Sequence, residues 1–236
     1  HRDLHSFPTR RSSDLELLLA VQASAMVMGL AALLATTLIS RVRGRSTVVM
    51  VVLAGMVVSA LFQAMVSLIK YVADPEEVLP AITYWLMGSM SRASFHGIAM
   101  GVPLIVGGMA VLFLLRWRLN ILSLQEDEAK SLGIDLRKLR LTVMTAATLI
   151  TASCVSLCGN VGWVGLLIPH AARMVCGSDN KRIVPISMAL GSAFMVLIDT
   201  AARSITAAEI PVSILTAIIG APFFILLLRR TRGARL

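Results

Sequence analysis

The chain has 236 residues, of which 57% are hydrophobic and only 15% are charged, and its mean hydropathy is +0.82. This composition is typical of integral membrane proteins and excludes an ordinary soluble globular domain. The formal net charge of +9 does not indicate nucleic-acid binding, because the basic residues are dispersed among segments that flank apolar runs.

Residues 1–15 differ from the rest of the chain. They are polar and basic, and the apolar run begins abruptly after Glu16. They contain no apolar core of a signal peptide. We therefore expect a foreign or disordered prefix at 1–15, with a native polar tail as the alternative, followed by a membrane domain over 16–236.

Crossing a hydrocarbon core of ~30 Å takes about 20 apolar residues. One uncharged stretch, 141–172, is too long for a single helix and short for two, so we divide it into a full helix and a short, broken one. The sequence thus predicts an all-α polytopic helical bundle. Its seven expected membrane segments lie at 17–39, 48–69, 97–115, 139–158, 161–176, 183–198 and 210–228.

The basic residues predict the orientation of these segments, because Lys and Arg concentrate in cytoplasmic loops. Regions expected on the opposite, outer side hold three such residues: Lys70, Arg92 and Arg203. We therefore expect the first span to run inward, the segment 71–96 to be external and the C-terminus to be cytoplasmic. Sixteen Lys/Arg lie in the regions expected on the cytoplasmic side, which are 41–45, 116–140, 173–182 and the tail after Leu228.

The segment 116–140 is long for a connection between helices and is amphipathic. Gly133 divides it into two potential short helices. A long amphipathic segment on the cytoplasmic side suits a partner surface, and a solvated connector is the alternative.

The stretch from Cys158 to Arg182 combines small residues with a helix breaker. Pro169 and His170 stand at membrane depth, which indicates a broken helix whose freed backbone groups need partners. A simple membrane anchor needs no such feature, so the pattern indicates a transport protein. Small residues recur at every third position before the proline and let helices approach closely in lipid: Gly159, Gly162 and Gly165.

No motif for nucleotide, metal or nucleophile chemistry is present in the sequence. G-x-x-x-x-G-K-[ST], H-E-x-x-H and a nucleophile elbow are all absent. Cys154 and Cys158 share a helix face, but a metal site would want more ligands nearby. We interpret His170 as a packing and hydrogen-bonding residue, with ligation of a metal complex as the alternative. The expectation is no catalytic residue, no cofactor and no metal site, so the chain is not itself an enzyme.

The residues G-x-x-G-x-V-G-L-x-x-P-H-x-x-R, followed by G-x-D-x-x-R and Pro185, resemble the signature of the FecCD family of ABC importer permeases. The resemblance runs from about Ala20 to the C-terminus. Departures from the usual family pattern are Trp163, Gln125, Asn180 and Ser213. Further matches in the family's order are W-L-M-G-S (85–89), L-N (119–120), A-K-S-L-G (129–133), D-x-x-A-R (199–203), E-x-P-V (209–212) and G-A-P-F-F (220–224).

This resemblance implies a ten-helix permease fold, of which the seven segments match the last seven, so that we expect a truncated chain. It also implies a permease subunit of a binding-protein-dependent importer for iron(III)-siderophore or a related chelate such as heme or cobalamin. The expected partners are a second permease copy (a homodimer or a paralogous heterodimer), ATP-binding cassette ATPases, an extracytoplasmic binding protein and the lipid bilayer, with no nucleic acid. The expected location is the bacterial plasma (inner) membrane.

The resemblance further assigns roles to residues. It implies that the segment 116–140 couples to the ATPase and that Arg203 meets an acidic residue of the binding protein, with an intrachain pair to Asp199 as the alternative. The coupling residues are Leu124, Glu128, Ala129, Leu132 and Gly133. The residues assigned to the helix-break signature are Gly162, Gly165, Pro169, His170 and Arg173.

Two other functional classes need features that this sequence lacks. An ion-coupled secondary transporter needs a charged relay in mid-membrane, whereas the acid inside a predicted span, Asp199, lies near an outer end beside Arg203. An intramembrane enzyme needs a paired catalytic constellation, which the sequence does not offer.

Overall fold

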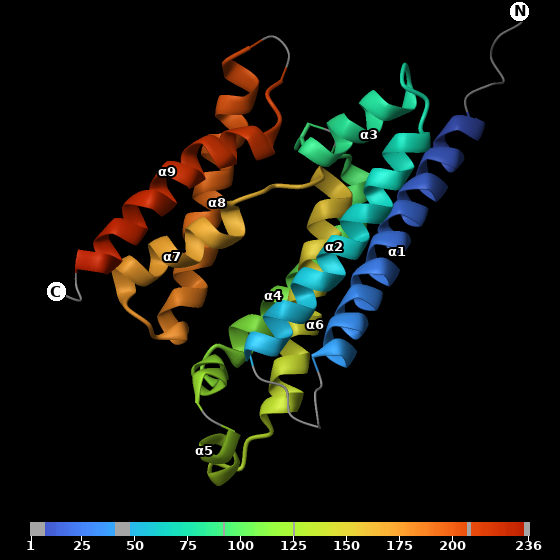
Figure 1. The fold of residues 1–236 in the computed structure, drawn as a ribbon. Coiled ribbons are helices and arrows are strands. Elements are labelled where there is room, and N and C mark those ends of the chain that lie inside the picture. Colours follow the sequence, from blue (N-terminus) through green and yellow to red (C-terminus); the bar gives the residue numbers. More distant parts are fainter. Residues whose placement is uncertain (1–7, 41–47, 92, 125, 207–208, 234–236) are drawn as a thin grey trace, which may run out of the picture. The chain divides into compact units, whose positions relative to one another are not determined.

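The computed structural model describes residues 8–40, 48–91, 93–124, 126–206 and 209–233. Every regular element in these ranges is helical and none is a strand (Figure 1), which confirms the all-α prediction. Several residues used in the sequence predictions lie outside the described ranges: residues 1–7 of the prefix, Arg41, Arg43, Arg45, Arg92, Gln125 and Arg235.

Five of the seven predicted segments are long, apolar helices in the described part of the chain. Between 6% and 17% of the residues in their most apolar windows are buried, so most of their side chains need an apolar solvent. The five are α1 (Pro8–Ile39, apolar from Glu16), α2 (Val48–Val72), α4 (Phe95–Leu115), α6 (Leu136–Cys158) and α8 (Asn180–Ser204).

The other two predicted segments coincide with shorter apolar helices. They are α7 (Val164–Cys176) and α9 (Val212–Gly233), of which Val212–Leu226 is the described apolar part. Helix α1 begins at Pro8, so residues 8–15 of the expected prefix are helical here rather than disordered.

One compact unit contains α1, α2, residues 95–108 of α4 and residues 144–157 of α6. Glycines on α4 allow its close approach to α6, because a Cβ added at Gly101 would lie 2.8 Å from Leu157 and one at Gly108 would lie 2.6 Å from Ile150. Helix α1 is attached to α6 by polar contacts. The Gln22 amide donates to Ser153 Oγ at 3.2 Å and accepts from the Ser156 hydroxyl.

The second unit contains residues 84–93, 109–143 and 158–236. In it α7, α8 and α9 pack against one another, and their contacts bury Ile168, Ala172 and Ala202. Gly191 on α8 contacts Ile168 on α7, because a Cβ added at Gly191 would lie 3.7 Å from Ile168 Cγ2. Small residues at these contacts again keep the helices close.

The segment 116–140 folds into two short helices, but not on either side of Gly133 as expected. They are η1 (Arg118–Ser123) and α5 (Glu126–Ser131), and both precede the glycine. Gly133 has a φ of +71° and separates α5 from α6. No short helix follows the glycine, because the long helix α6 already begins at Leu136. Asp135 caps this start, since its Oδ1 accepts the backbone N–H of Arg137 at 2.9 Å.

The helix break expected at Pro169–His170 is wrong in its position. Helix α7 runs through Pro169 to Cys176, and the non-helical backbone lies earlier, at 159–163. Pro169 removes one i→i−4 hydrogen bond, to the Gly165 carbonyl, and the helix continues across that loss. The division of 141–172 into a long and a short helix is confirmed.

Helix α3 (Val78–Met87) ends against the turn between α6 and α7. Gly88 and Gly159, both with φ above +70°, meet there backbone to backbone. A Cβ on Gly159 would lie 2.4 Å from the Trp85 carbonyl oxygen, and one on Gly88 would lie 2.3 Å from the Asn160 carbonyl oxygen. Neither neighbour is a flexible side chain, so the two glycines cannot be replaced without moving a backbone segment.

We predict that Gly159→Ala destabilises the protein far more than Gly177→Ala. Both glycines have positive φ, a backbone conformation that strains an alanine by about 1–3 kcal/mol, but nothing lies within 4 Å of a Cβ at Gly177. The overlap at Gly159 adds about 1–3 kcal/mol of overpacking. Denaturant titration of each variant in detergent measures the difference, and equal midpoints would contradict the backbone contact.

Candidate functional site

Several residues that the sequence singled out lie at or near the two ends of α8. At its start, Asp179 is the N-cap and its Oδ1 accepts the Lys181 N–H at 3.0 Å. Its backbone carbonyl accepts the N–H groups of Arg182 and Ile183, both at 3.0 Å. Asp179 therefore satisfies the N–H groups of Lys181, Arg182 and Ile183.

Asn120, from the η1 helix, joins this cap with both ends of its amide. Its Nδ2 donates to Asp179 Oδ1 at 2.8 Å, and its Oδ1 accepts the Asn180 N–H at 2.9 Å. The hydrogen bond from Asn120 is the main reason that the pKa of Asp179 lies below its ordinary value, and the Lys181 N–H adds to it. The carboxylate thus stays charged, as a helix N-terminus favours.

A second contact reinforces this junction. Lys181 Nζ lies 3.9 Å from the centroid of the Trp117 ring, which is a cation–π geometry. We call Trp117, Asn120, Asp179 and Lys181 the α8 clamp. It fixes the start of the segment 116–140 to the first turn of α8.

The five residues expected to couple to an ATPase have different environments. Two of them are large apolar side chains that are exposed: Leu132 is 60% exposed and Leu124 is 38% exposed. Ala129 is fully buried, and its carbonyl accepts the N–H groups of Leu132 and Ile134. The exposed leucines are therefore available to a partner, whereas Ala129 supports the turn. The remaining two, Glu128 and Gly133, are exposed.

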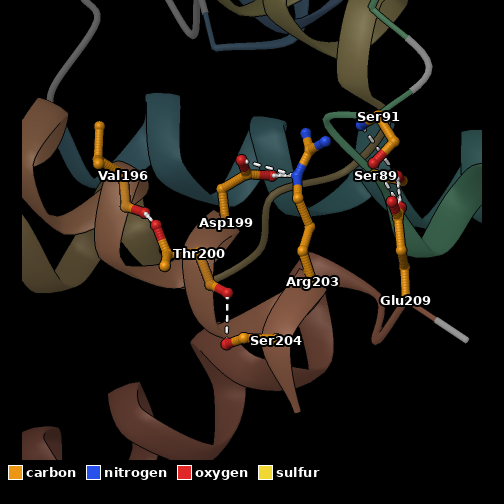
Figure 2. Close-up of polar contacts among 8 residues, drawn as sticks. All are labelled: Ser89, Ser91, Val196, Asp199, Thr200, Arg203, Ser204 and Glu209. Atoms are coloured by element: carbon orange, nitrogen blue, oxygen red, sulfur yellow. Dashed lines mark hydrogen bonds and ion pairs between the residues drawn. The ribbon is translucent and has the colours of Figure 1, made fainter. Parts of the chain in front are cut away.

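At the other end of α8, Arg203 is paired within the chain. Its Nε donates to both carboxylate oxygens of Asp199, at 3.1 Å and 3.0 Å (Figure 2). The side chain of Arg203 remains 46% exposed. The alternative reading of Arg203 as the partner of Asp199 is thus realised in the free chain, and the exposure leaves the guanidinium accessible.

Glu209 connects the turn after α8 to the turn after α3. Its Oε2 accepts the Ser91 hydroxyl at 2.5 Å and the Ser89 hydroxyl at 3.3 Å (Figure 2). These bonds, the Ser91 bond first, and the positive charge of Arg203 lower the pKa of Glu209. Ser89 and Glu209 belong to the motifs at 85–89 and 209–212, whereas Ser91 belongs to none, and nothing in the spacing of 118 and 120 residues indicated these contacts.

Backbone hydrogen bonds fasten the same turns. The Ser89 N–H donates to the Cys158 carbonyl at 2.9 Å, and the Val212 N–H donates to the Gly88 carbonyl at 3.1 Å. The motifs at 85–89, 158–173 and 209–212, which are far apart in the sequence, therefore meet in one place. We call Gly88, Ser89, Ser91, Cys158, Glu209 and Val212 the turn junction.

Residues of the helix-break signature line the α7–α9 contact. Gly162 has a φ of +78°, and a Cβ there would lie 2.9 Å from Thr216 Oγ1. Thr216 is fully buried, and its hydroxyl donates to the Val161 carbonyl at 2.8 Å, with the Ser213 carbonyl as a second acceptor at 3.1 Å. This bond satisfies the non-helical backbone before α7 and was not foreseen from the sequence.

His170 packs as the sequence analysis interpreted it. Its Nδ1 lies 2.7 Å from the Leu166 carbonyl oxygen, and its ring makes an edge contact with Phe224 at 5.8 Å between centroids. Trp163 contacts the same phenylalanine ring at 6.4 Å. Gly165 has open space around its Cβ position, and Arg173 is exposed in the last turn of α7. Within the described residues, no group of three His, Cys, Asp or Glu could hold a metal ion.

The model of the FecCD transport family matches residues 14–230. A molybdate import system permease protein, MolB, from Haemophilus influenzae is 42% identical over 212 residues, which cover 89% of this chain and 63% of the relative. A permease protein named for iron chelatin transport, from Helicobacter pylori, is 40% identical over 200 residues, 85% of this chain and 61% of the relative. The chain thus spans about three fifths of the length of these relatives.

A solved structure gives the same picture for the fold. It is an inward-facing conformation of a protein assigned to the metal-chelate type of ABC transporter. The two chains are 43% identical with a TM-score of 0.76, and the match covers 78% of this chain and 60% of the other.

We predict that Thr216→Val destabilises the chain by about 1–3 kcal/mol, because it leaves the Val161 carbonyl without its donor in a buried place. Thr200→Val is the matched control, since Thr200 also bonds to a carbonyl, that of Val196 at 2.7 Å, but is exposed. Thermal unfolding of both variants in detergent measures the effect. If the two midpoints fall equally, the buried bond has no special role.

Proposed function

The chain belongs to the FecCD transport family, and from this membership we propose that it is the membrane permease subunit of a binding-protein-dependent ABC importer. The observation that carries the proposal is the family match over residues 14–230. The five long apolar helices agree with a multi-pass protein of the bacterial inner membrane. In such an importer ATP hydrolysis belongs to separate cassette subunits, and this chain has a non-enzymatic transport role.

The assembly follows from the same proposal. Two permease copies form the pathway between them, two ATPases attach to their cytoplasmic side, and a binding protein delivers cargo from outside. The exposed Leu124 and Leu132 support an ATPase surface at 116–140, because apolar anchors of this kind commonly fill pockets of a partner. This arrangement requires the C-terminus and the α8 clamp to be cytoplasmic and the turn junction to be external, as the charge distribution predicts.

For the cargo we propose a metal chelate of the iron(III)-siderophore class. The relative named for iron chelatin transport supports it, as does the metal-chelate type of the solved transporter. The relative named for molybdate import supports a second candidate, a small oxyanion. An ion-coupled transporter is less well supported, because Asp199 is paired with Arg203 at a helix end instead of standing alone in a span.

Transport by the complete importer, reconstituted with its ATPase and binding protein in vesicles, tests both levels of the proposal. We expect ATP-dependent uptake of a labelled iron(III)-siderophore, and little uptake of molybdate, heme or cobalamin. ATP-dependent uptake of molybdate alone would replace the cargo and keep the importer. Uptake that follows an ion gradient without ATP would overturn the importer itself.

We further propose that Arg203 docks the binding protein through a carboxylate, because its planar fork holds a carboxylate bidentately. Arg203→Gln should weaken binding-protein affinity about tenfold or more, equal to ~1.4 kcal/mol, while the permease–ATPase complex stays assembled. Binding of the wild-type pair should weaken as salt rises. Binding in nanodiscs by surface plasmon resonance measures both effects.

Two variants separate docking from the intrachain pair. Asp199→Asn removes the partner of Arg203 but keeps the guanidinium, so docking should persist. Lys70→Glu changes a charge expected on the same side, in the last turn of α2, and should leave affinity nearly unchanged. If Asp199→Asn and Arg203→Gln both prevent assembly, the pair is structural and the docking role is wrong.

A further inference from the structure

Helix α8 is fastened at both ends, and each fastening uses side chains from a distant part of the sequence. Its start is held by the α8 clamp, through Asn120 on η1. Its end continues into the turn junction, where the Ile210 N–H donates to the Ala202 carbonyl at 3.1 Å and Glu209 bonds to Ser89 and Ser91 (Figure 2). With 25 residues at 1.5 Å each, α8 is about 37 Å long, enough to separate the fastenings by a membrane thickness.

The first turn of α8 depends on Asn120 more than an ordinary helix start would. Pro185 lies inside the helix and cannot donate to the carbonyl of Lys181. That loss weakens the link between the first turn and the rest of the helix. Asn120 offsets it from outside, since its two hydrogen bonds hold Asp179 and the Asn180 backbone together.

The chemistry of the clamp requires an amide at position 120. One group must donate to a carboxylate while its neighbouring atom accepts a backbone N–H, and an asparagine side chain provides both at once. A carboxylate at position 120 would still accept the Asn180 N–H. Its second oxygen, however, would replace the Nδ2 that now lies 2.8 Å from Asp179 Oδ1, and two negative charges would repel each other there.

We propose that Asn120 is a positioning residue for coupling: it makes the segment 116–124 and α8 move as one body, so that displacement by the ATPase reaches the turn junction and Arg203 at the far end. This inference rests on the proposed importer function. Coupling between distant ends needs a physical element with defined connections at both, and α8 with its two fastenings is such an element. In this role Asn120 transmits the displacement and binds neither partner.

A swap of the two clamp residues tests the proposal in the assembled importer. Asn120→Asp should lower cargo uptake per ATP hydrolysed at least tenfold, with the ATPase still co-purifying. The double variant Asn120→Asp, Asp179→Asn restores one amide facing one carboxylate, and the amide at position 179 still caps α8. It should recover coupling to within about threefold of the wild type. Asp74→Asn, which changes another cap that accepts two backbone N–H groups, is the control and should couple normally.

Spin labels provide a readout that does not depend on transport. Cysteines replacing the exposed Arg118 and Arg182, in a background without Cys154, Cys158 and Cys176, report the distance between η1 and α8. The distance distribution should be narrow in the wild type, broad in Asn120→Asp and narrow again in the double variant. A narrow distribution in all three, or a double variant that stays uncoupled, would overturn the role of Asn120. If the wild-type complex neither transports nor hydrolyses ATP, the importer proposal fails, and the spin-label result alone then decides whether the clamp exists.

Discussion

Backbone N–H and C=O groups that leave a helix need other hydrogen-bond partners, and the second unit depends on how its non-helical segments meet this requirement. The Ser89 N–H uses the Cys158 carbonyl, and the Val212 N–H uses the Gly88 carbonyl. The Val161 carbonyl receives the hydroxyl of the buried Thr216. Each turn therefore supplies what another lacks. Helices α7 and α9 can be short because these turns satisfy one another.

The two ends of α8 use different chemistry for the same purpose. The clamp relies on an amide between a capped carboxylate and a backbone N–H, so its geometry is strict. The turn junction relies on serine hydroxyls, which rotate to suit an acceptor, and on an exposed carboxylate. A fixed attachment at one end and an adaptable one at the other fit an element that is driven from the first and responds to a partner at the second.

Much of the fold followed from the sequence because apolar length is a local property. The long helices and the division of 141–172 derive from runs of neighbouring residues, whereas the two short helices within 116–140 both precede Gly133 instead of flanking it. Pro169 misled the prediction of the break, since one missing hydrogen bond is tolerated in a helix, whereas the positive φ values of Gly159 and Gly162 mark the true interruption. The contacts of Asn120 with Asp179 and of Glu209 with Ser91 join residues 59 and 118 positions apart, and no periodicity encodes such pairs.

The separation within the turn junction also governs the order in which the chain matures during synthesis. Ser89 precedes its partner Glu209 by 120 residues, which a ribosome adding about 5–20 residues per second needs roughly 6–24 s to produce. Throughout that interval the turn after α3 exists without the carboxylate and without the Val212 N–H that later complete it. The junction therefore cannot close before position 209 has been synthesised, and a chain that stalls earlier leaves the turn after α3 without these two partners.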